Sequence, residues 1–200
     1  MNISVRTDFS ALPVAMPFTL RLLVELSGPY PSGDGCWVRF SPSVERVRIS
    51  QLTGYDHAPD GYRVLPPRST DEPCRVVLEL RVLPQYGRGD ILLGKVEVVP
   101  CRHDDAEGSA AVPVTICLVS PRQFATVMQD QEVAVIALLQ VITALRRQAD
   151  HLLSCNLHHR AAIWLGQRVA ALETLGVVEP QVVAAIEELR LLSLECRGNR

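Results

Sequence analysis

Hydrophobic and polar residues alternate along the first part of the chain. Between Thr19 and Leu26, four aliphatic side chains occupy one side and Arg21 and Glu25 the other, which is the pattern of a half-buried strand. Similar runs predict strands within residues 36–40, 44–52, 62–65, 75–82, 91–99 and 111–119. In the run 91–99, the alternation places Leu92, Val96 and Val98 inward.

Prolines and glycines separate these runs. Thirteen of the 14 prolines and nine of the 12 glycines lie in residues 1–121. About eight short strands with turns every 8–12 residues or so are typical of an antiparallel β-sandwich. The alternation is one-sided, whereas strands of a parallel α/β sheet are apolar on both faces.

The period changes to that of a helix after Pro121. Polar residues at 140, 143, 147, 150 and 154 form a narrow stripe on a predicted helix from about Asp130 to Ser154. Asn156 is a plausible break, and a second helix is expected at about 158–175, with Gly176 as its C-cap. Pro180 suits the first turn of a third helix, at about 179–195.

These patterns predict an α+β protein. An N-terminal antiparallel β-sandwich of about eight strands, residues 1–121, precedes a helical domain of about three helices, residues 122–200, arranged as a bundle or a hairpin. Leu138, Leu145, Leu165, Val169, Ile186 and Leu189 are the expected contacts of the helical part.

Composition narrows the function little. The chain is 48% hydrophobic and 21% charged with a formal net charge of −2, which disfavours a nucleic-acid surface or a polybasic membrane patch. The N-terminus lacks the pattern of a signal peptide, and the apolar run 133–145 is too short to span a bilayer, so a cytoplasmic protein is expected. None of the six cysteines forms a C-x-x-C pair.

The densest group of candidate metal ligands is His103, Asp104 and Asp105, between two strands that form a predicted hairpin. A solvated acidic turn is the favoured interpretation, and a metal-dependent hydrolase is the alternative. The chain contains no nucleophile elbow, Walker A loop or G-x-G-x-x-G motif. We therefore expect no enzyme, no catalytic residue and no cofactor.

Large side chains supply the candidates for protein interaction. They are Tyr30, Trp37, Leu145, Trp164 and Leu189. For Trp37, a place in the sandwich core is favoured over an exposed aromatic contact beside Tyr30.

Several segments resemble the non-catalytic part of bacterial proteins that contain a von Willebrand factor A (VWA) domain. They are Phe18–Leu26, Val44–Leu52, Cys74–Val82, Gly89–Val98 and the tail segments 130–134 and 138–141. The resemblance implies an accessory β-sandwich and a C-terminal helical segment. The metal-binding signature D-x-S-x-S is absent, because Asp8-Phe9-Ser10-Ala11-Leu12 stops short of it. The chain thus resembles the sandwich and tail without the VWA domain.

The leading hypothesis is a non-catalytic interaction or scaffold module of bacteria. It would bind another protein through a sandwich edge or the helical tail. The resemblance implies a partner such as a VWA-domain protein, an ATPase or a protease encoded nearby, in an ATPase-associated or conflict system. A self-assembling structural subunit is a further alternative, so homo-oligomers are also considered.

Overall fold

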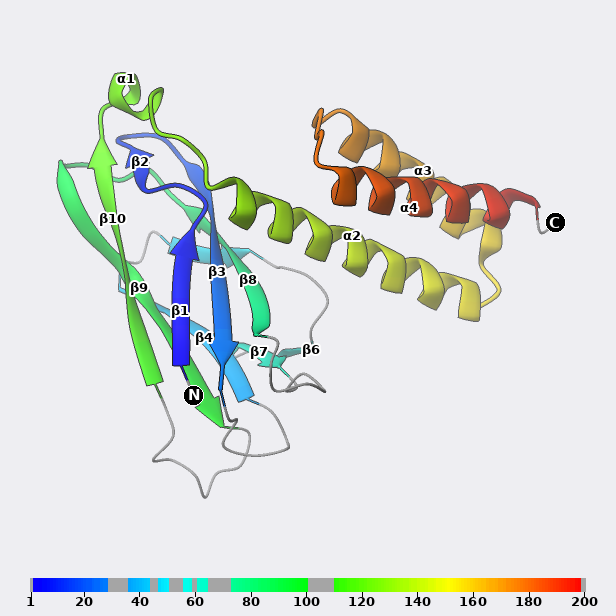
Figure 1. Cartoon of the computed structure of the whole chain (residues 1–200), viewed down its shortest axis with the longest axis horizontal. Helices are drawn as coiled ribbons and strands as arrows, with labels where there is room; N and C mark the ends of the chain where they lie inside the picture. Colours follow the sequence, from blue (N-terminus) through cyan, green and yellow to red (C-terminus); the bar gives the residue numbers. More distant parts are fainter. Residues whose placement is uncertain are drawn as a thin grey trace. The chain divides into compact units, whose positions relative to one another are not determined.

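The computed structural model describes residues 2–28, 36–43, 47–50, 56–58, 61–64, 73–100 and 110–198. The chain divides into two compact units, Met1–Ala134 and Val135–Arg200. Secondary structure changes from strand to helix at residues 120–121, and the first unit extends to residue 134 because the segment that follows the last strand is bonded to the strands. Figure 1 shows the strands of the first unit and the long helices of the second.

The first unit is built from two sheets. The four-stranded sheet has the order β1 (Asn2–Thr7), β3 (Phe18–Ser27), β8 (Cys74–Val82), β5 (Val47–Ser50). The six-stranded sheet has the order β2 (Ala11–Pro13), β10 (Ala110–Val119), β9 (Gly89–Pro100), β4 (Cys36–Pro42), β7 (Gly61–Val64), β6 (Asp56–Ala58). Within the described residues β2 pairs with β10 in parallel, and the other strand pairs are antiparallel.

One hydrophobic core lies between the sheets. Leu20, Leu22, Val24 and Leu26 of β3 are fully buried in it, as the alternation predicts. The facing sheet contributes aliphatic side chains from β4, β9 and β10. Together with the three long helices described below, this arrangement confirms the α+β prediction of an antiparallel sandwich followed by a helical region.

A β-bulge overturns one expected orientation. Leu92 is 46% exposed, whereas its neighbour Leu93 is fully buried. The register between β9 and β10 shifts at this point, which reverses the inward and outward positions before the bulge. Gly94 fits the site because a Cβ there would meet the Ser41 carbonyl oxygen and the Phe40 ring. The prediction that Leu92 points inward is therefore wrong.

Three aromatic rings pack together where the sandwich leads into α1 (Pro121–Phe124). The centroid of Phe18 lies 5.3 Å from that of Phe9 and 5.2 Å from that of Phe124. A capping box stabilises the helix start, because the Ser120 hydroxyl accepts from the Gln123 N–H while the Gln123 side chain accepts from the Ser120 N–H.

Asp8 joins the first strand to the segment that leads into α2. Among the described residues it is the sole buried charged side chain, with 1% exposure. Its N–H donates to the Arg21 carbonyl at 2.9 Å, but the Arg21 N–H donates to the Asp8 carboxylate at 2.8 Å. The Asp8 carbonyl accepts instead from the Asp130 N–H at 2.7 Å. Gln129 adds a bond from its side-chain amide to the same carboxylate, at 3.4 Å.

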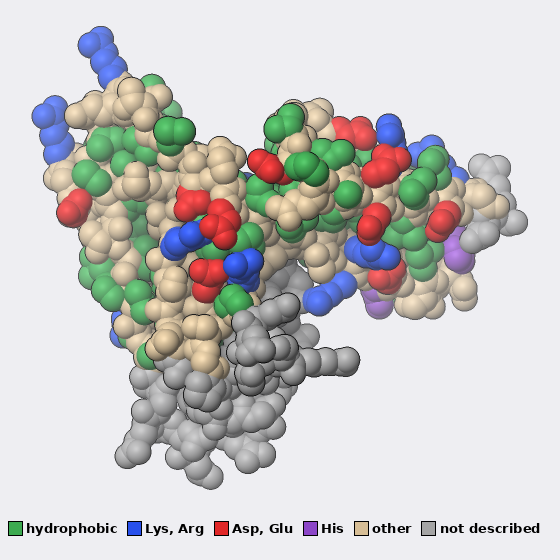
Figure 2. Space-filling view, viewed as in Figure 1, with side chains coloured by type: hydrophobic (Ala, Val, Ile, Leu, Met, Phe, Trp, Pro, Cys, Tyr) green, Lys and Arg blue, Asp and Glu red, His purple; other side chains and the backbone are tan. Residues whose placement is uncertain are grey.

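The first turn of α2 (Gln131–Ser154) is tied to the four-stranded sheet by ion pairs. Asp130 caps it by accepting from the Val133 N–H. Arg6 of β1 contacts Glu132 at 2.8 Å, and Arg75 of β8 lies 4.0 Å from the same carboxylate. The hydrogen bond to Glu132 raises the pKa of Arg6, so this pair stays charged. In Figure 2, acidic and basic side chains gather on one face of this unit.

Two residues on the outer face of the four-stranded sheet are also buried. Leu23 and Val77 are paired across β3 and β8 and are 0% and 1% exposed, although they point away from the sandwich core. Val133 of α2 is also fully buried. The four-stranded sheet therefore has buried apolar side chains on its outer face as well as in the sandwich core.

The second unit contains the rest of α2, with α3 (His158–Glu173) and α4 (Pro180–Gly198). The predicted helix bounds are confirmed to within a few residues. The Asn156 backbone has a φ of 57°, with bonds from its N–H to the Leu153 carbonyl and from the Leu157 N–H to the Leu152 carbonyl. These two bonds form a Schellman ending. The expected break at Asn156 is thus confirmed.

The helical core matches the expected contacts. Leu165, Val169, Ile186 and Leu189 are buried in one cluster, and Leu138 and Leu145 pack against it partly buried. The polar stripe of α2 remains outside this cluster, with Thr143 and Asp150 exposed. The helical unit therefore packs on itself through the residues that the 3.6-residue period selects.

Asp8 makes stability depend on pH. Burial is the main reason that the pKa of its carboxyl is raised above the ordinary 3.8, against the lowering effect of the Arg21 N–H. The ionised group therefore costs folding free energy above the folded pKa, and this cost disappears as pH falls toward the unfolded pKa. As the pH is lowered from about 7 to about 4, the unfolding free energy of the parent chain should rise relative to that of Asp8→Asn. Urea titrations at each pH provide the measurement.

Asp8→Ala is the companion variant. It leaves the Arg21 N–H without its acceptor, so it should cost about 1–3 kcal/mol of unfolding free energy, and this cost should grow as pH falls because the parent chain gains stability. The assigned burial of the carboxylate is contradicted if the difference in unfolding free energy between the parent chain and Asp8→Asn stays constant with pH. It is also contradicted if Asp8→Asn becomes the more stable of the two as pH falls.

Leu189→Ala should destabilise the helical unit. The side chain is 1% exposed within the helical cluster, so its truncation should lower the unfolding free energy by about 2–5 kcal/mol. Leu145→Ala should cost less because Leu145 is partly buried. Leu175→Ala is the matched control, since Leu175 is 60% exposed and should change stability by no more than about 0.5 kcal/mol. Equal effects at positions 189 and 175 would refute this packing.

Candidate functional site

Two of the sequence-derived candidates cannot be placed, and a third lies on the sandwich surface. Tyr30 and the cluster His103, Asp104 and Asp105 fall outside the described residues. Trp37 lies on β4 between buried Cys36 and Val38, and its half-buried side chain is on the outer face of the sheet. The favoured place of Trp37 in the sandwich core is therefore wrong, because the inward positions of β4 are the even-numbered ones.

The other candidates belong to the helical unit. Leu189 is part of its core, and Leu145 and Trp164 pack against that core partly buried. The Arg168 guanidinium carbon lies 5.9 Å from the centre of the Trp164 ring, a cation–π distance. Leu189 therefore serves packing, whereas Leu145 and Trp164 keep part of their surface in water.

A groove of about 300 Å³ runs between α2 and α4 within the helical unit. Its walls carry aliphatic side chains that include Leu139, Ile142 and Leu192. Arg146 and Glu188 face each other across the rim, with 2.8 Å between guanidinium and carboxylate. Because both groups are more than half exposed, this ion pair contributes little stability and can open without a large cost.

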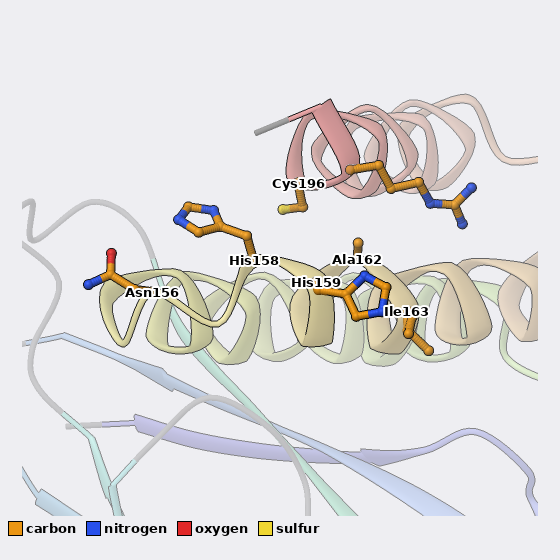
Figure 3. A pocket seen from close by; sticks show the side chains of 7 residues that line it. Asn156, His158, His159, Ala162, Ile163 and Cys196 are labelled. Atoms are coloured by element: carbon orange, nitrogen blue, oxygen red, sulfur yellow. The ribbon is translucent and has the colours of Figure 1, made fainter. Parts of the chain in front are cut away.

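A second pocket of about 500 Å³ lies between the start of α3 and the end of α4. Figure 3 shows the side chains around it: Asn156, His158 and His159 come from the turn and first residues of α3, and Cys196 points toward it from α4. Arg197 completes the rim. The first turn of α3 has neither an acidic residue nor a side-chain cap. Its electrostatic character therefore favours anions over cations.

Cys196 is unsuited to nucleophilic chemistry in this pocket. Burial raises the pKa of its thiol, and the nearby Glu195 carboxylate raises it further. A thiol with a raised pKa remains protonated near neutral pH, whereas the thiolate is the reactive form. The Nδ1 atom of His158 is buried and has no hydrogen-bond partner within the described part of the chain. The arrangement thus offers a binding pocket rather than an activated nucleophile.

Metal ligands do not converge in the part of the chain that the structure describes. No group of three His, Cys, Asp or Glu side chains there could hold a metal ion. The loop with His103, Asp104 and Asp105 lies outside that part, so the metal-dependent alternative stays open.

The outer edge of β1 is the candidate site in the sandwich unit, and β10 of the other sheet lies close to this strand. β1 is the end strand of its sheet and pairs with β3 on one side. Hydrogen-bonded positions alternate along an antiparallel pair, and Asp8 opposite Arg21 is one of them. Arg6 and Ser4 lie two and four residues before Asp8, so their N–H and C=O groups also face β3. Those of Ile3, Val5 and Thr7 face the other way, toward the edge.

Sequence reasoning missed this strand. Asn2–Thr7 reads as polar and apolar residues in weak alternation, and only Ile3 and Val5 are aliphatic. The spacing of Ile3 and Val5, two residues apart, is the sequence signal that indicates a strand here. Both side chains pack against the sandwich core. β2 and β6 were also missed because three residues are too few to show a period.

Comparison with known proteins adds little to these observations. No family model matches the chain, and no curated protein matches it. Among solved structures, it is similar to the ASH/PapD-like domain of human CEP192 (PapD-like domain 7), with 16% identity and a TM-score of 0.31. The match covers 59% of this chain and 84% of that domain. The resemblance is too partial to transfer a function.

Proposed function

We propose that this protein is a non-catalytic interaction module whose sandwich binds an extended segment of another protein along β1. The observation that carries the proposal is the outward set of backbone groups at Ile3, Val5 and Thr7. Such groups can form a ladder with an added strand, as in β-strand addition. Backbone pairing would supply affinity, and side-chain contacts on each face would supply specificity.

β1 is better suited to strand addition than the other described edges. β2 and β6 have three residues each and β5 has four, so they offer few backbone groups. The part of β10 beyond its pairing with β2 contains Pro113, which lacks an N–H and blunts the edge. β1 has six residues, none of them proline or lysine.

The chemistry of the neighbouring side chains describes the segment that would fit. Ile3 and Val5 of β1 pack on the sandwich core, whereas Asn2 and Ser4 are exposed on the outer face. A partner strand with alternating apolar and polar residues would continue both faces. Arg6 is already paired with Glu132, so this end of the edge adds no unpaired charge that would demand an acidic partner.

The class of partner is a proposal that rests on the sequence resemblance. VWA-domain proteins, ATPases or proteases encoded next to this chain are the first candidates, in a bacterial cytoplasm. None of the described helices combines the length and apolar character that a membrane crossing requires.

Proline at an outward position should block the interaction. Val5→Pro removes an N–H that faces the edge and places a ring where the partner backbone would lie, so the affinity for the neighbour-encoded partner should fall by about tenfold or more. Isothermal titration calorimetry of the purified pair provides the measurement. Circular dichroism and urea unfolding show whether the variant keeps the sandwich.

Ala111→Pro is the matched control. Ala111 is exposed on β10 and has the same parity as Pro113, so the variant alters the edge of the other sheet. It should leave the affinity unchanged. Equal loss in both variants would indicate a general effect on the sandwich, and unchanged binding in folded Val5→Pro would refute pairing along β1.

A further inference from the structure

The outward face of α4 carries large apolar side chains in contact with water. Val183, Leu191 and Leu194 are 48%, 52% and 53% exposed. At about 100° per residue, these three positions and the charged pair Glu187 and Arg190 fall within an arc of about 100°. The opposite side of α4 holds the buried residues of the helical core. α4 therefore has a second face, which we call the α4 outer face.

Four of the five residues on the α4 outer face are placed symmetrically about the middle of the helix, and Leu191 is the exception because its counterpart, Ile186, is buried in the helical core. Val183 and Leu194 lie equally far from the point midway between residues 188 and 189, and so do Glu187 and Arg190. An antiparallel copy of the same helix would place Val183 against Leu194 of the partner subunit. In the same register, Glu187 would meet Arg190 of the partner subunit, and the symmetric contact would form a second time.

We propose that the α4 outer face binds the same face of a second copy of this chain, in an antiparallel arrangement with two-fold symmetry. A two-fold interface requires a surface that is complementary to itself, and reversal of this face matches Val183 with Leu194 and Glu187 with Arg190. An unrelated partner would have to supply both matches from its own sequence. The inference rests on α4 and is independent of the edge of β1.

The existing contacts of the charged pair do not prevent this pairing. Arg190 lies 3.2 Å from Glu187 and 3.6 Å from Glu173, and all three side chains are about half exposed. The guanidinium has five N–H donors, so it can keep a contact within its own chain while it binds a carboxylate of the second copy. In Figure 2, hydrophobic side chains alternate with acidic and basic ones on the visible side of the helices.

The expected dimer is weak. Three half-exposed aliphatic side chains per copy make a small contact, and interfaces below about 1,200 Å² belong to transient associations. Sedimentation of the full chain from about 10 µM to about 1 mM should show the mass rising from 22.1 kDa toward twice that value. A constant monomer mass over this range would overturn the proposal.

Charge reversal tests the register. Glu187→Arg places two arginines opposite each other at both symmetric contacts, and Arg190→Glu does the same with two glutamates. Each variant alone should associate at least about tenfold more weakly than the parent chain. An equimolar mixture of the two should recover dimers, because each copy then supplies the charge that the other lacks. A mixture that stays monomeric would overturn the antiparallel arrangement.

Two leucine variants separate this face from general stickiness. Leu194→Glu should abolish the dimer, whereas Leu175→Glu should leave it intact, because Leu175 is 60% exposed but lies outside α4. Equal loss in both would assign the association to another surface and overturn the proposal. All substituted positions are exposed, and far-UV circular dichroism checks that the helices are kept. Recovery in the mixture also excludes misfolding as the cause of lost association.

Discussion

The buried carboxylate of Asp8 is the interaction on which the arrangement of the sandwich unit depends. It accepts the Arg21 N–H in place of a strand carbonyl, which leaves the Asp8 carbonyl to bind the Asp130 N–H. One residue thereby ends the β1 ladder and fixes the segment before α2. The cost is the burial of a charge, seen in the raised pKa of Asp8, and the hydrogen bonds from the Arg21 N–H and the Gln129 amide to the carboxylate offset part of it.

The consequences reach the start of α2 and the edge strand β1. Asp130, held by Asp8, precedes the first turn of α2, in which Glu132 forms ion pairs with Arg6 and Arg75. Val133 of the same turn is fully buried. The same hydrogen bonds define which backbone groups of β1 turn outward. The proposed binding edge and the start of the helical segment thus follow from one local arrangement.

Periodicity predicted the long elements, because a buried face repeats over many residues. The α2 stripe and the β3 alternation are such cases. It failed at the Leu93 bulge, where one extra residue exchanges the inward and outward positions of β9. It also cannot show hydrogen bonds between residues far apart in the sequence, such as Asp8 and Asp130. The residue type of Trp37 favours the core, but its odd-numbered position in β4 places it on the outer face of the sheet. β1, the candidate site, could not be inferred, because an edge is a property of the whole sheet.

Amide hydrogen exchange along β1, followed by NMR in the isolated chain at concentrations that keep it monomeric, tests the central claim most directly. The account predicts an alternating pattern: the Ser4 and Arg6 amides, bonded to β3, exchange slowly, and the Ile3, Val5 and Thr7 amides exchange fast. Uniform protection from Ile3 to Thr7 would show that the edge is already covered, and would contradict the proposal that β1 receives a partner strand.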